Sequence, residues 1–430
     1  MHRLRRKFLF VLSVIGVVVF LNSFAFAIET PEPKSGGKFF QYKGTRADKG
    51  YQDQGRPGGP VYEYGKGLLL GPVLVKPAIE YSSRWENNIF YTENGRKDDF
   101  VQSLKPGFRA ELPFGGGQHL VAAGYEADYQ WFDRFQKEDH IDHTVFAGVD
   151  LNYVPFTLSV SDTFKRTENR ANTEFTSRVL RDENNASALL EIPFATFFLE
   201  TEVEDYDINF LDVVNSAFDY HDFDIYQRVG VDISPQTQVL VEYGHMDIHY
   251  WQTDDRDGDA DQVMLGLRGT LTQRISYQIW GGTQFRIYHD STRPDFNGFV
   301  SRAALRYDIS ETNFLTLKFN RNPEESTFDN QSFYVRNQGT AEWKKQIAER
   351  LYLGMDVSLS YNEYSRITET GTQSRTRRDY VWGAGAGLEY FMPNDIVSFF
   401  GEYRYNARDT NLHDLGYDAQ SFNVGVRARY

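Results

Sequence analysis

The chain has 430 residues, of which 40% are hydrophobic and 25% charged, with 34 Phe, 27 Tyr, 6 Trp and no Cys. The aromatic content excludes a disordered chain, and the absence of cysteine excludes disulfides, thiolate metal sites and thiol nucleophiles. The mean hydropathy is −0.54, and beyond the first thirty residues no uncharged apolar run reaches the roughly 18 residues that a membrane-spanning helix needs.

Residues 1–27 have the pattern of a secretory signal peptide. Four basic residues within positions 3–7 precede an apolar stretch at 8–21, and the segment ends in Ala25-Phe26-Ala27. We predict cleavage after Ala27, the alternative being a retained inner-membrane anchor. The mature chain then carries 42 basic and 60 acidic residues, a net charge of −18. This negative net charge argues against a nucleic-acid partner.

Residues 28–70 differ in composition, because proline and glycine are scattered among polar residues. This pattern predicts an extended N-terminal leader without a core of its own. Its aromatic residues, among them Phe39, Phe40 and Tyr62, equally allow a plug threaded into the structure that follows. Residues 71–430 then form the main domain.

From about residue 73 onward, apolar and polar residues alternate with a period of two, which predicts long strands with one apolar face. The apolar positions of the clearest segments are Val121, Ala123, Tyr125, Ala127, Tyr129 and Trp131; Val263, Leu265 and Leu267; Ala303, Leu305, Tyr307 and Ile309; Leu351, Leu353, Met355, Val357 and Leu359; Val397, Phe399, Tyr403 and Tyr405; and Phe422, Val424, Val426, Ala428 and Tyr430. The residues between them are mostly polar or charged.

The connections between these strands alternate in length. Short turns are predicted at 113–117, 155, 193, 234–237, 272–274, 310–312, 348–349 and 393–395. Longer polar loops are predicted between them, for example at 92–97, 134–139, 168–174, 252–260, 321–330, 367–375 and 407–415. Such a pattern joins about 18 strands, and short periplasmic turns with long external loops are typical of a membrane barrel.

The hydrocarbon of the membrane requires the predicted sheet to close on itself. A strand in hydrocarbon must pair every backbone N–H and C=O group, so no open edge is tolerated. We therefore predict an all-β, transmembrane antiparallel β-barrel of about 18 strands in the bacterial outer membrane, with its apolar faces against the membrane lipids. The alternative is a soluble secreted sandwich or a carbohydrate-binding repeat, in which the aromatic stripes would be core.

The start of the barrel resembles a known family. Gly71-Pro72, Pro77, Tyr81, Trp85, Asn88, Ile89 and Phe90 are similar to its opening strand, and Asp99, Phe100 and Pro106-Gly107-Phe108 are similar to its second strand. The family is putative β-barrel porin 2, and the resemblance covers about residues 70–430. It implies an 18-stranded outer-membrane channel linked to exopolysaccharide export, and it carries no catalytic residues.

The alternative of an enzyme at the barrel rim, of the lipase or protease type, depends on few residues. His245, Asp247 and His249 share one face of a strand, but the alternation places that face outward, which is typical of a polar rim. The chain contains no Gly-x-Ser-x-Gly, His-Glu-x-x-His or phosphate-loop motif. We therefore predict a protein that is not an enzyme.

The polar faces of the strands predict the lining of a lumen. The candidates are Glu126, Asp128, Arg268, Arg302, Arg306, Trp280 and Tyr288. In a ring of 18 strands the two acidic residues lie across from Arg302 and Arg306, which would set up a transverse field unless the charges pair with neighbours. The aromatic rings, together with Tyr226, Tyr334 and Tyr352, would let a sugar chain slide along them, or would pack against an internal loop.

One external loop suggests a cation. Asp255, Asp257, Asp259 and Asp261 are spaced two apart around Gly258. They resemble the first half of a calcium loop, although the distal Glu of an EF-hand is missing and a solvated acidic loop has the same composition. Apart from this Ca2+ hypothesis we expect no cofactor.

These observations predict a passive conduit for exopolysaccharide export, with the polysaccharide and periplasmic export components as partners. The alternatives are a general or sugar-uptake porin and the rim enzyme.

Overall fold

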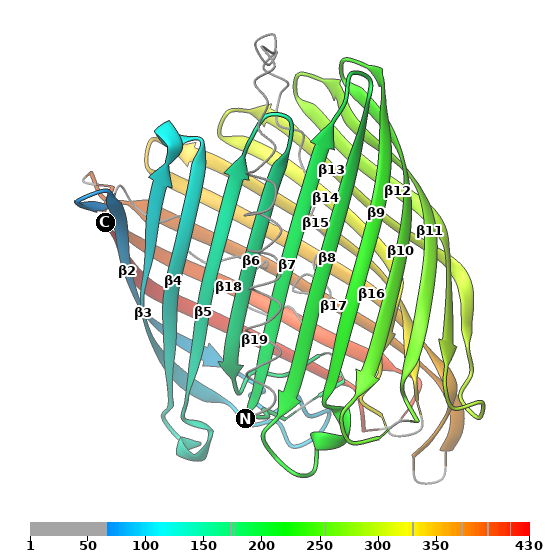
Figure 1. The fold of residues 1–430 in the computed structure, drawn as a ribbon. Coiled ribbons are helices and arrows are strands. Elements are labelled where there is room, and N and C mark those ends of the chain that lie inside the picture. The colour runs from blue at the N-terminus through cyan, green and yellow to red at the C-terminus, as the bar shows by residue number, and fades with distance from the viewer. Residues whose placement is uncertain are drawn as a thin grey trace. The chain divides into compact units, whose positions relative to one another are not determined.

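A computed structural model describes residues 67–172, 174–175, 177–253, 255–328, 331–370, 373–393, 395–412 and 414–430. The predicted signal peptide and positions 28–66 of the predicted leader or plug lie outside these residues. In the described part, the chain winds strand after strand around a barrel wall, in the colour order of Figure 1.

A short strand, β1 (Leu68–Leu70), pairs with the start of the first long one. The long strands are β2 (Val73–Glu86), β3 (Asp99–Phe114), β4 (His119–Phe132), β5 (His140–Asn152), β6 (Thr157–Thr167), β7 (Arg181–Pro193), β8 (Phe197–Phe210), β9 (Tyr220–Ser234), β10 (Thr237–Tyr250), β11 (Gly258–Thr272), β12 (Ile275–Tyr288), β13 (Phe296–Ser310), β14 (Asn313–Glu325), β15 (Phe333–Ala348), β16 (Leu351–Thr370), β17 (Gln373–Phe391), β18 (Val397–Thr410) and β19 (Tyr417–Arg429).

The barrel is closed. Each long strand pairs antiparallel with the next, and β19 pairs back onto β2, with Ser421 opposite Glu86 and Arg429 opposite Ala78. The 18 long strands of the described chain therefore form a ring without a free edge, as the sequence predicts. Every strand can pair its backbone on both sides, which a wall in hydrocarbon requires.

The helical elements of the described residues are single 3-10 turns, η2 (Gly115–Gly117), η3 (Gln136–Glu138) and η4 (Ser216–Phe218). No helix in this part of the chain is long and apolar enough to span a membrane.

The two ends of the barrel differ as predicted. Tight turns close one end, for example between Ser234 and Thr237, whereas the other end carries long loops such as 168–180 between β6 and β7. Long loops lie outside the cell in outer-membrane barrels, so we call this the external end.

Four predicted loops are wrong in extent. Residues 367–375 mostly continue the hairpin of β16 and β17, with Ile367 opposite Thr376, because β-branched residues such as Ile367 and Thr370 favour an extended ladder. Residues 258–260 belong to β11, residues 321–325 to β14 and residues 407–410 to β18.

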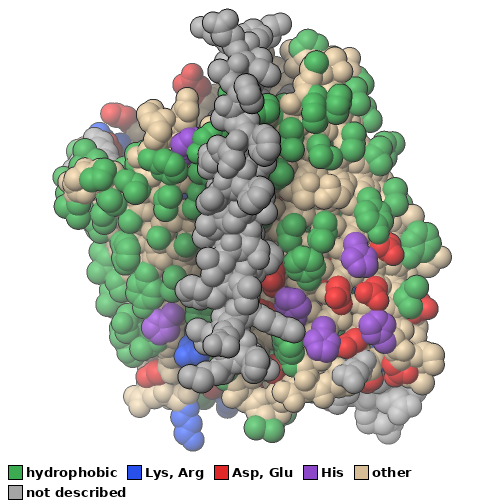
Figure 2. All heavy atoms as spheres, in the orientation of Figure 1, with side chains coloured by type: hydrophobic (Ala, Val, Ile, Leu, Met, Phe, Trp, Pro, Cys, Tyr) green, Lys and Arg blue, Asp and Glu red, His purple; other side chains and the backbone are tan. Residues whose placement is uncertain are grey.

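The period-two alternation sorts side chains to the two faces of the wall. On β11, Val263 and Leu265 are 50% and 61% exposed, while Met264 and Arg268 are 3% and 5% exposed. Val424 on β19 is also 61% exposed. Figure 2 shows hydrophobic side chains spread over much of the outer surface. The outward face is thus apolar and suited to lipid, as predicted.

The inward face is not uniformly open. On β8 to β15, apolar and aromatic side chains of successive strands pack together on the inner side of the wall. This cluster consists of Phe198, Leu240, Met264, Trp280, Tyr288, Phe296, Val300 and Phe333. It fills one side of the interior and leaves the open space to the other side.

Candidate functional site: the lumen and its external mouth

The main cavity of the described barrel has a volume of 1740 Å³ and is lined by residues of β2 to β8 and β14 to β19. At the external end its lining includes Tyr91, Asn169 and Arg170, which belong to long loops. At the opposite end it includes Glu349 and Asp395, which belong to tight turns. The cavity therefore extends along the length of the wall.

The lining of this cavity is polar and nearly balanced in charge. It contains 14 Lys and Arg against 12 Asp and Glu. One part of the wall, on β5 to β7, presents hydroxyl and amide groups from Thr144, Ser161, Thr163, Asn185 and Ser187. A balanced lining gives little net field to attract either sign of ion, and the hydroxyls and amides offer hydrogen bonds to a neutral solute.

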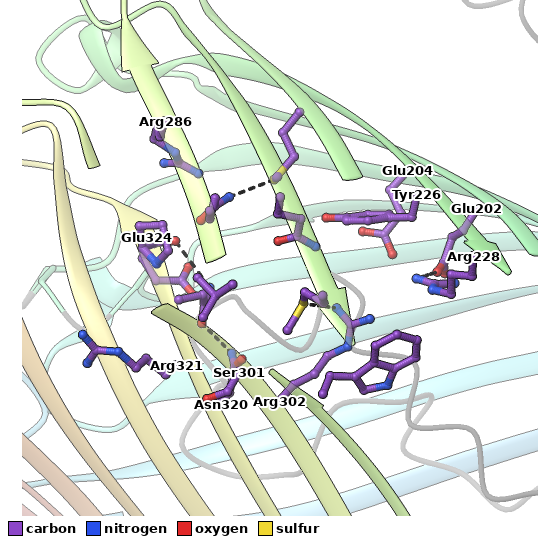
Figure 3. A pocket seen from close by; sticks show the side chains of 18 of the residues that line it. Glu202, Glu204, Tyr226, Arg228, Arg286, Ser301, Arg302, Asn320, Arg321 and Glu324 are labelled. Atoms are coloured by element: carbon purple, nitrogen blue, oxygen red, sulfur yellow. Dashed lines mark hydrogen bonds and ion pairs between the residues drawn. The ribbon is translucent and has the colours of Figure 1, made fainter. Parts of the chain in front are cut away.

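A second, smaller cavity of 110 Å³ lies on the filled side and is surrounded by ion pairs (Figure 3). The Arg228 guanidinium lies 2.7 Å from Glu202 and 2.5 Å from Glu242. Arg268 lies 2.6 Å from Glu200. Arg228 and its two partners come from neighbouring strands, whereas Arg268 of β11 reaches Glu200 of β8 across the filled side; in both cases opposite charges neutralise one another. Their burial makes the loss of one partner costly.

The predicted lumen residues fall into three groups. Glu126 and Asp128 line the larger cavity. Arg268, Arg302 and Trp280 line the smaller one. The other two, Arg306 and Tyr288, are not lining residues of either cavity.

Both of these remaining side chains are held by neighbours. Arg306 Nε lies 2.8 Å from Asp308, and its guanidinium covers the Phe314 ring. Tyr288 is 4% exposed and stacks on Phe333.

The expected transverse field is replaced by local pairing, the alternative that the sequence left open. Lys105 Nζ lies 2.7 Å from Asp128 Oδ2 on the neighbouring strand. Arg302 pairs with Glu242 across the filled side. Charges compensated within a few ångströms produce little field across a wet lumen.

The aromatic residues proposed for sugar contact are mostly used in packing. Trp280 is 2% exposed, and the guanidiniums of Arg302 and Arg228 lie 4.7 and 6.0 Å from the centre of its ring. Tyr226 and Tyr334 are 6% and 1% exposed. Of these rings, Tyr352 lines the larger cavity.

The external mouth is crossed by a loop whose presence the sequence predicts but whose contact with the opposite side does not follow from it. Glu174, in the 168–180 loop between β6 and β7, contacts the β14–β15 loop from the far side of the ring. Its carboxylate accepts hydrogen bonds from Ser326 Oγ at 2.8 Å, Thr327 N at 2.7 Å and Thr327 Oγ1 at 2.9 Å. We call residues 168–180 the strap and these three bonds the latch.

The two ends of the strap are attached to the β2–β3 loop. Arg170 Nη2 donates to the Ile89 carbonyl at 2.6 Å, and its guanidinium lies 3.6 Å from the centre of the Tyr91 ring. Arg178 Nη1 donates to the same carbonyl at 3.3 Å. Burial raises the pKa of Tyr91 above its ordinary value, so the phenol is neutral beside the strap. The strap is therefore held at three places around the mouth.

The β14–β15 loop that receives the latch is itself held by arginines. Arg256 donates to the carbonyls of Ser326 and Phe328, each at 2.7 Å. Arg293 pairs with Asp255 and donates to Ser332 Oγ. Burial raises the pKa of Asp255, but hydrogen bonds from Thr253 and Arg293 outweigh it and hold that pKa below its ordinary value.

The four aspartates of the hypothetical calcium loop do not converge in the structure. Asp255 pairs with Arg293, and Asp257 accepts from the Tyr250 backbone N–H. The last two lie on β11 and face histidines, Asp259 with His289 and Asp261 with His245. The reason is that β11 begins at Gly258, so that strand pairing takes the place of the expected loop turn.

The residues considered for a rim enzyme lie on the outer face of β10. His245 and His249 bond to different aspartates, Asp261 at 3.0 Å and Asp257 at 2.7 Å. Two separate pairs match the polar-rim alternative rather than one catalytic constellation, which needs its groups to meet at a single reacting atom.

Comparison with known proteins finds a matching family and solved structures with a similar fold. A family model described as Putative beta-barrel porin 2 matches residues 60–430. No curated protein sequence matches the chain. Solved structures similar to it include the outer membrane protein opdK from Pseudomonas aeruginosa, at 8% identity and a TM-score of 0.44 over 83% of this chain and 99% of that chain. OpdL from the same organism is 11% identical, with a TM-score of 0.44 over 84% and 99%. OccAB3 from Acinetobacter baumannii is 9% identical, with a TM-score of 0.44 over 83% and 99%.

Proposed function

Because the chain belongs to the putative beta-barrel porin 2 family and is an outer-membrane β-barrel channel, we propose that its lumen is a passive conduit for exported polysaccharide. The observation that carries the proposal is the larger cavity, whose lining continues from the strap to the tight turns. A barrel of 18 strands tilted by about 40° has a backbone diameter of about 35 Å, which leaves room for this passage beside the filled side.

The chemistry of the lining supports a sugar polymer as the cargo. The hydroxyl and amide groups of β5 to β7 can exchange hydrogen bonds with a passing polyol, so no single contact has to be strong. Balanced charges avoid trapping a charged unit of the chain. No covalent chemistry is required, because transport of this kind depends on the size and polarity of the passage.

Uptake of small sugars is the second candidate, and the strap favours it. A loop latched across the mouth narrows the opening, which small solutes pass more easily than a polymer does. Export of a polymer would require the latch to open. The two candidates thus differ in what happens to the Glu174 contact during transport.

A pair of adjacent substitutions on β7 tests the proposal. Ser187 lines the larger cavity, whereas Ala188 is on the opposite parity and faces outward. We expect Ser187→Trp to lower secreted polysaccharide and single-channel conductance, and Ala188→Trp to leave both unchanged. The assays are polymer released by a complemented deletion strain and current through planar bilayers.

Three outcomes contradict the proposal. Unchanged polymer release in the deletion strain together with impaired growth on small sugars would favour uptake. Absence of conductance together with hydrolysis of lipid or peptide would favour a rim enzyme. Equal effects of the two tryptophans would mean that the passage does not run along β7.

A further inference from the structure

The outer face of the barrel carries a group of acidic and histidine side chains near the external end. Figure 2 shows acidic and histidine side chains gathered low on this face of the barrel. Within this group, Asp205 and Asp207 of β8 and His221 of β9 bring one ligand atom each to within 4.8 Å of one another.

Strand geometry explains why these three side chains meet. Residues two apart on a strand point to the same face, so Asp205 and Asp207 share the outer face of β8. Asp207 is directly opposite His221 in the β8–β9 register. The strand pair therefore holds an imidazole and two carboxylates side by side without any loop to order.

Both distances from the imidazole nitrogen to the carboxylate oxygens match those between ligands of a divalent metal ion. His221 Nδ1 lies 3.1 Å from Asp207 Oδ1 and 3.4 Å from Asp205 Oδ1. Ligands at about 2.0 to 2.2 Å from a tetrahedral or octahedral metal are separated from each other by about 3.0 to 3.5 Å. The imidazole and each carboxylate are thus already spaced as a metal would hold them.

The surroundings favour a cation and let it enter. The side chains of His221, Asp205 and Asp207 are 28%, 26% and 19% exposed. Asp247 lies on the same outer face of the neighbouring strand, since its register partner Phe223 is two residues from His221. Three carboxylates around one imidazole leave excess negative charge, and solvent can supply the remaining ligands of a bound ion.

We propose that Asp205, Asp207 and His221 form a binding site for a divalent transition metal such as Zn2+ on the outer wall of the barrel. The imidazole determines the metal class, because Ca2+ and Mg2+ prefer oxygen ligands alone, whereas Zn2+ takes both imidazole and carboxylate. The site is separate from the passage, because all three residues are on the outward parity of their strands.

The test uses the full-length barrel without an affinity tag, in detergent micelles, with Zn2+ alone and with Co2+ as a spectroscopic probe. We expect one equivalent of Zn2+ to bind, to raise the melting temperature, and to be displaced by a chelator. His221→Ala and the isosteric Asp207→Asn should each weaken binding at least about tenfold and remove the Co2+ absorption bands. His245→Ala is the matched control, because His245 also faces outward but pairs with the single carboxylate of Asp261.

Heat-dependent gel mobility would establish that each variant is a closed barrel before binding is compared. Saturable binding that depends on Asp207 and His221 but not on His245 supports the site. The proposal is overturned if the wild type binds no Zn2+ saturably, if His221→Ala and Asp207→Asn bind as the wild type does, or if His245→Ala abolishes binding equally.

Discussion

The latch makes a quantitative prediction about the external mouth. Glu174→Ala removes a carboxylate that is 7% exposed and accepts three hydrogen bonds from the β14–β15 loop. A hydrogen bond to a charged group contributes about 1.5 to 3 kcal/mol, but bonds that share one carboxylate do not add independently. The freed donors also regain water at the mouth. We therefore expect the docked strap to lose about 3 kcal/mol, which is about a 100-fold shift toward the released state.

Two measurements read this shift. The strap contains Arg170 and Arg178, so trypsin should cleave the strap of the folded Glu174→Ala protein much faster than that of the wild type. Conductance in planar bilayers should rise or fluctuate more, because the mouth is open for a larger fraction of time. Glu174→Gln should be intermediate, since its amide has one carbonyl oxygen to accept hydrogen bonds.

Glu168→Ala is the matched control, because it removes the same charge from the same loop outside the latch. Its cleavage rate and conductance should equal those of the wild type. If Glu174→Ala and Glu168→Ala behave alike, the strap is not held by the latch and the mouth is controlled elsewhere.

The remaining predictions concern the wall and the outer loops. Leu265→Arg, at the centre of β11 on the lipid face, should destabilise the barrel by about 2 to 4 kcal/mol, measured by urea titration in lipid vesicles. Thr163→Arg, on a lumen face, should cost less than about 1 kcal/mol in the same assay. Similar losses for the two variants would refute the assignment of faces. Arg268→Leu should destabilise by about 2 to 3 kcal/mol, because the buried Glu200 loses its closest partner and keeps only the Arg228 guanidinium at 3.8 Å; the added change Glu200→Gln should recover part of the loss. The fold lowers the pKa of Asp255 below its ordinary value of 3.8. The stability that the ionised Asp255 gives to its loop is therefore complete above pH 3.8, and it is lost as the pH falls through the lower pKa of the folded state. Protease resistance of its loop should thus be constant from pH 7 down to about 5; a loss within that range would contradict the direction of the shift.

The faces of the strands could be predicted from the sequence because one physical rule decides them. Alternation assigned Leu265 outward and Arg268 inward without any long-range information, since a period of two is a local property of the backbone. The closure of the sheet could also be predicted, because the lipid around the barrel tolerates no unpaired strand edge. The error at residues 367–375 arose because polar composition was given more weight than the β-branched residues that extend the hairpin.

The contents of the lumen could not be predicted in the same way. Alternation places Trp280 inside, but whether its ring is open to a passing solute depends on Arg228 and Arg302, which come from two other strands. The latch joins residues 152 apart in the sequence, between two loops that have no periodicity. A detectable sign was the spacing of charges in the strap, where Arg170, Glu174 and Arg178 follow one another at intervals of four with Phe175, Val179 and Leu180 among them.

The pairing of β2 with β19 has a consequence for how the protein is made. Glu86 and Ser421 are partners across nearly the whole chain, so the seam forms only after the last strand has been synthesised and delivered. Until then both β2 and β19 expose rows of unpaired backbone groups, which is a hazard for association with other chains. An unfinished barrel cannot stay in hydrocarbon with these rows open, so insertion and closure must occur together. Substitutions along the seam should therefore act first on the yield of assembled protein, and a channel that does assemble should conduct normally.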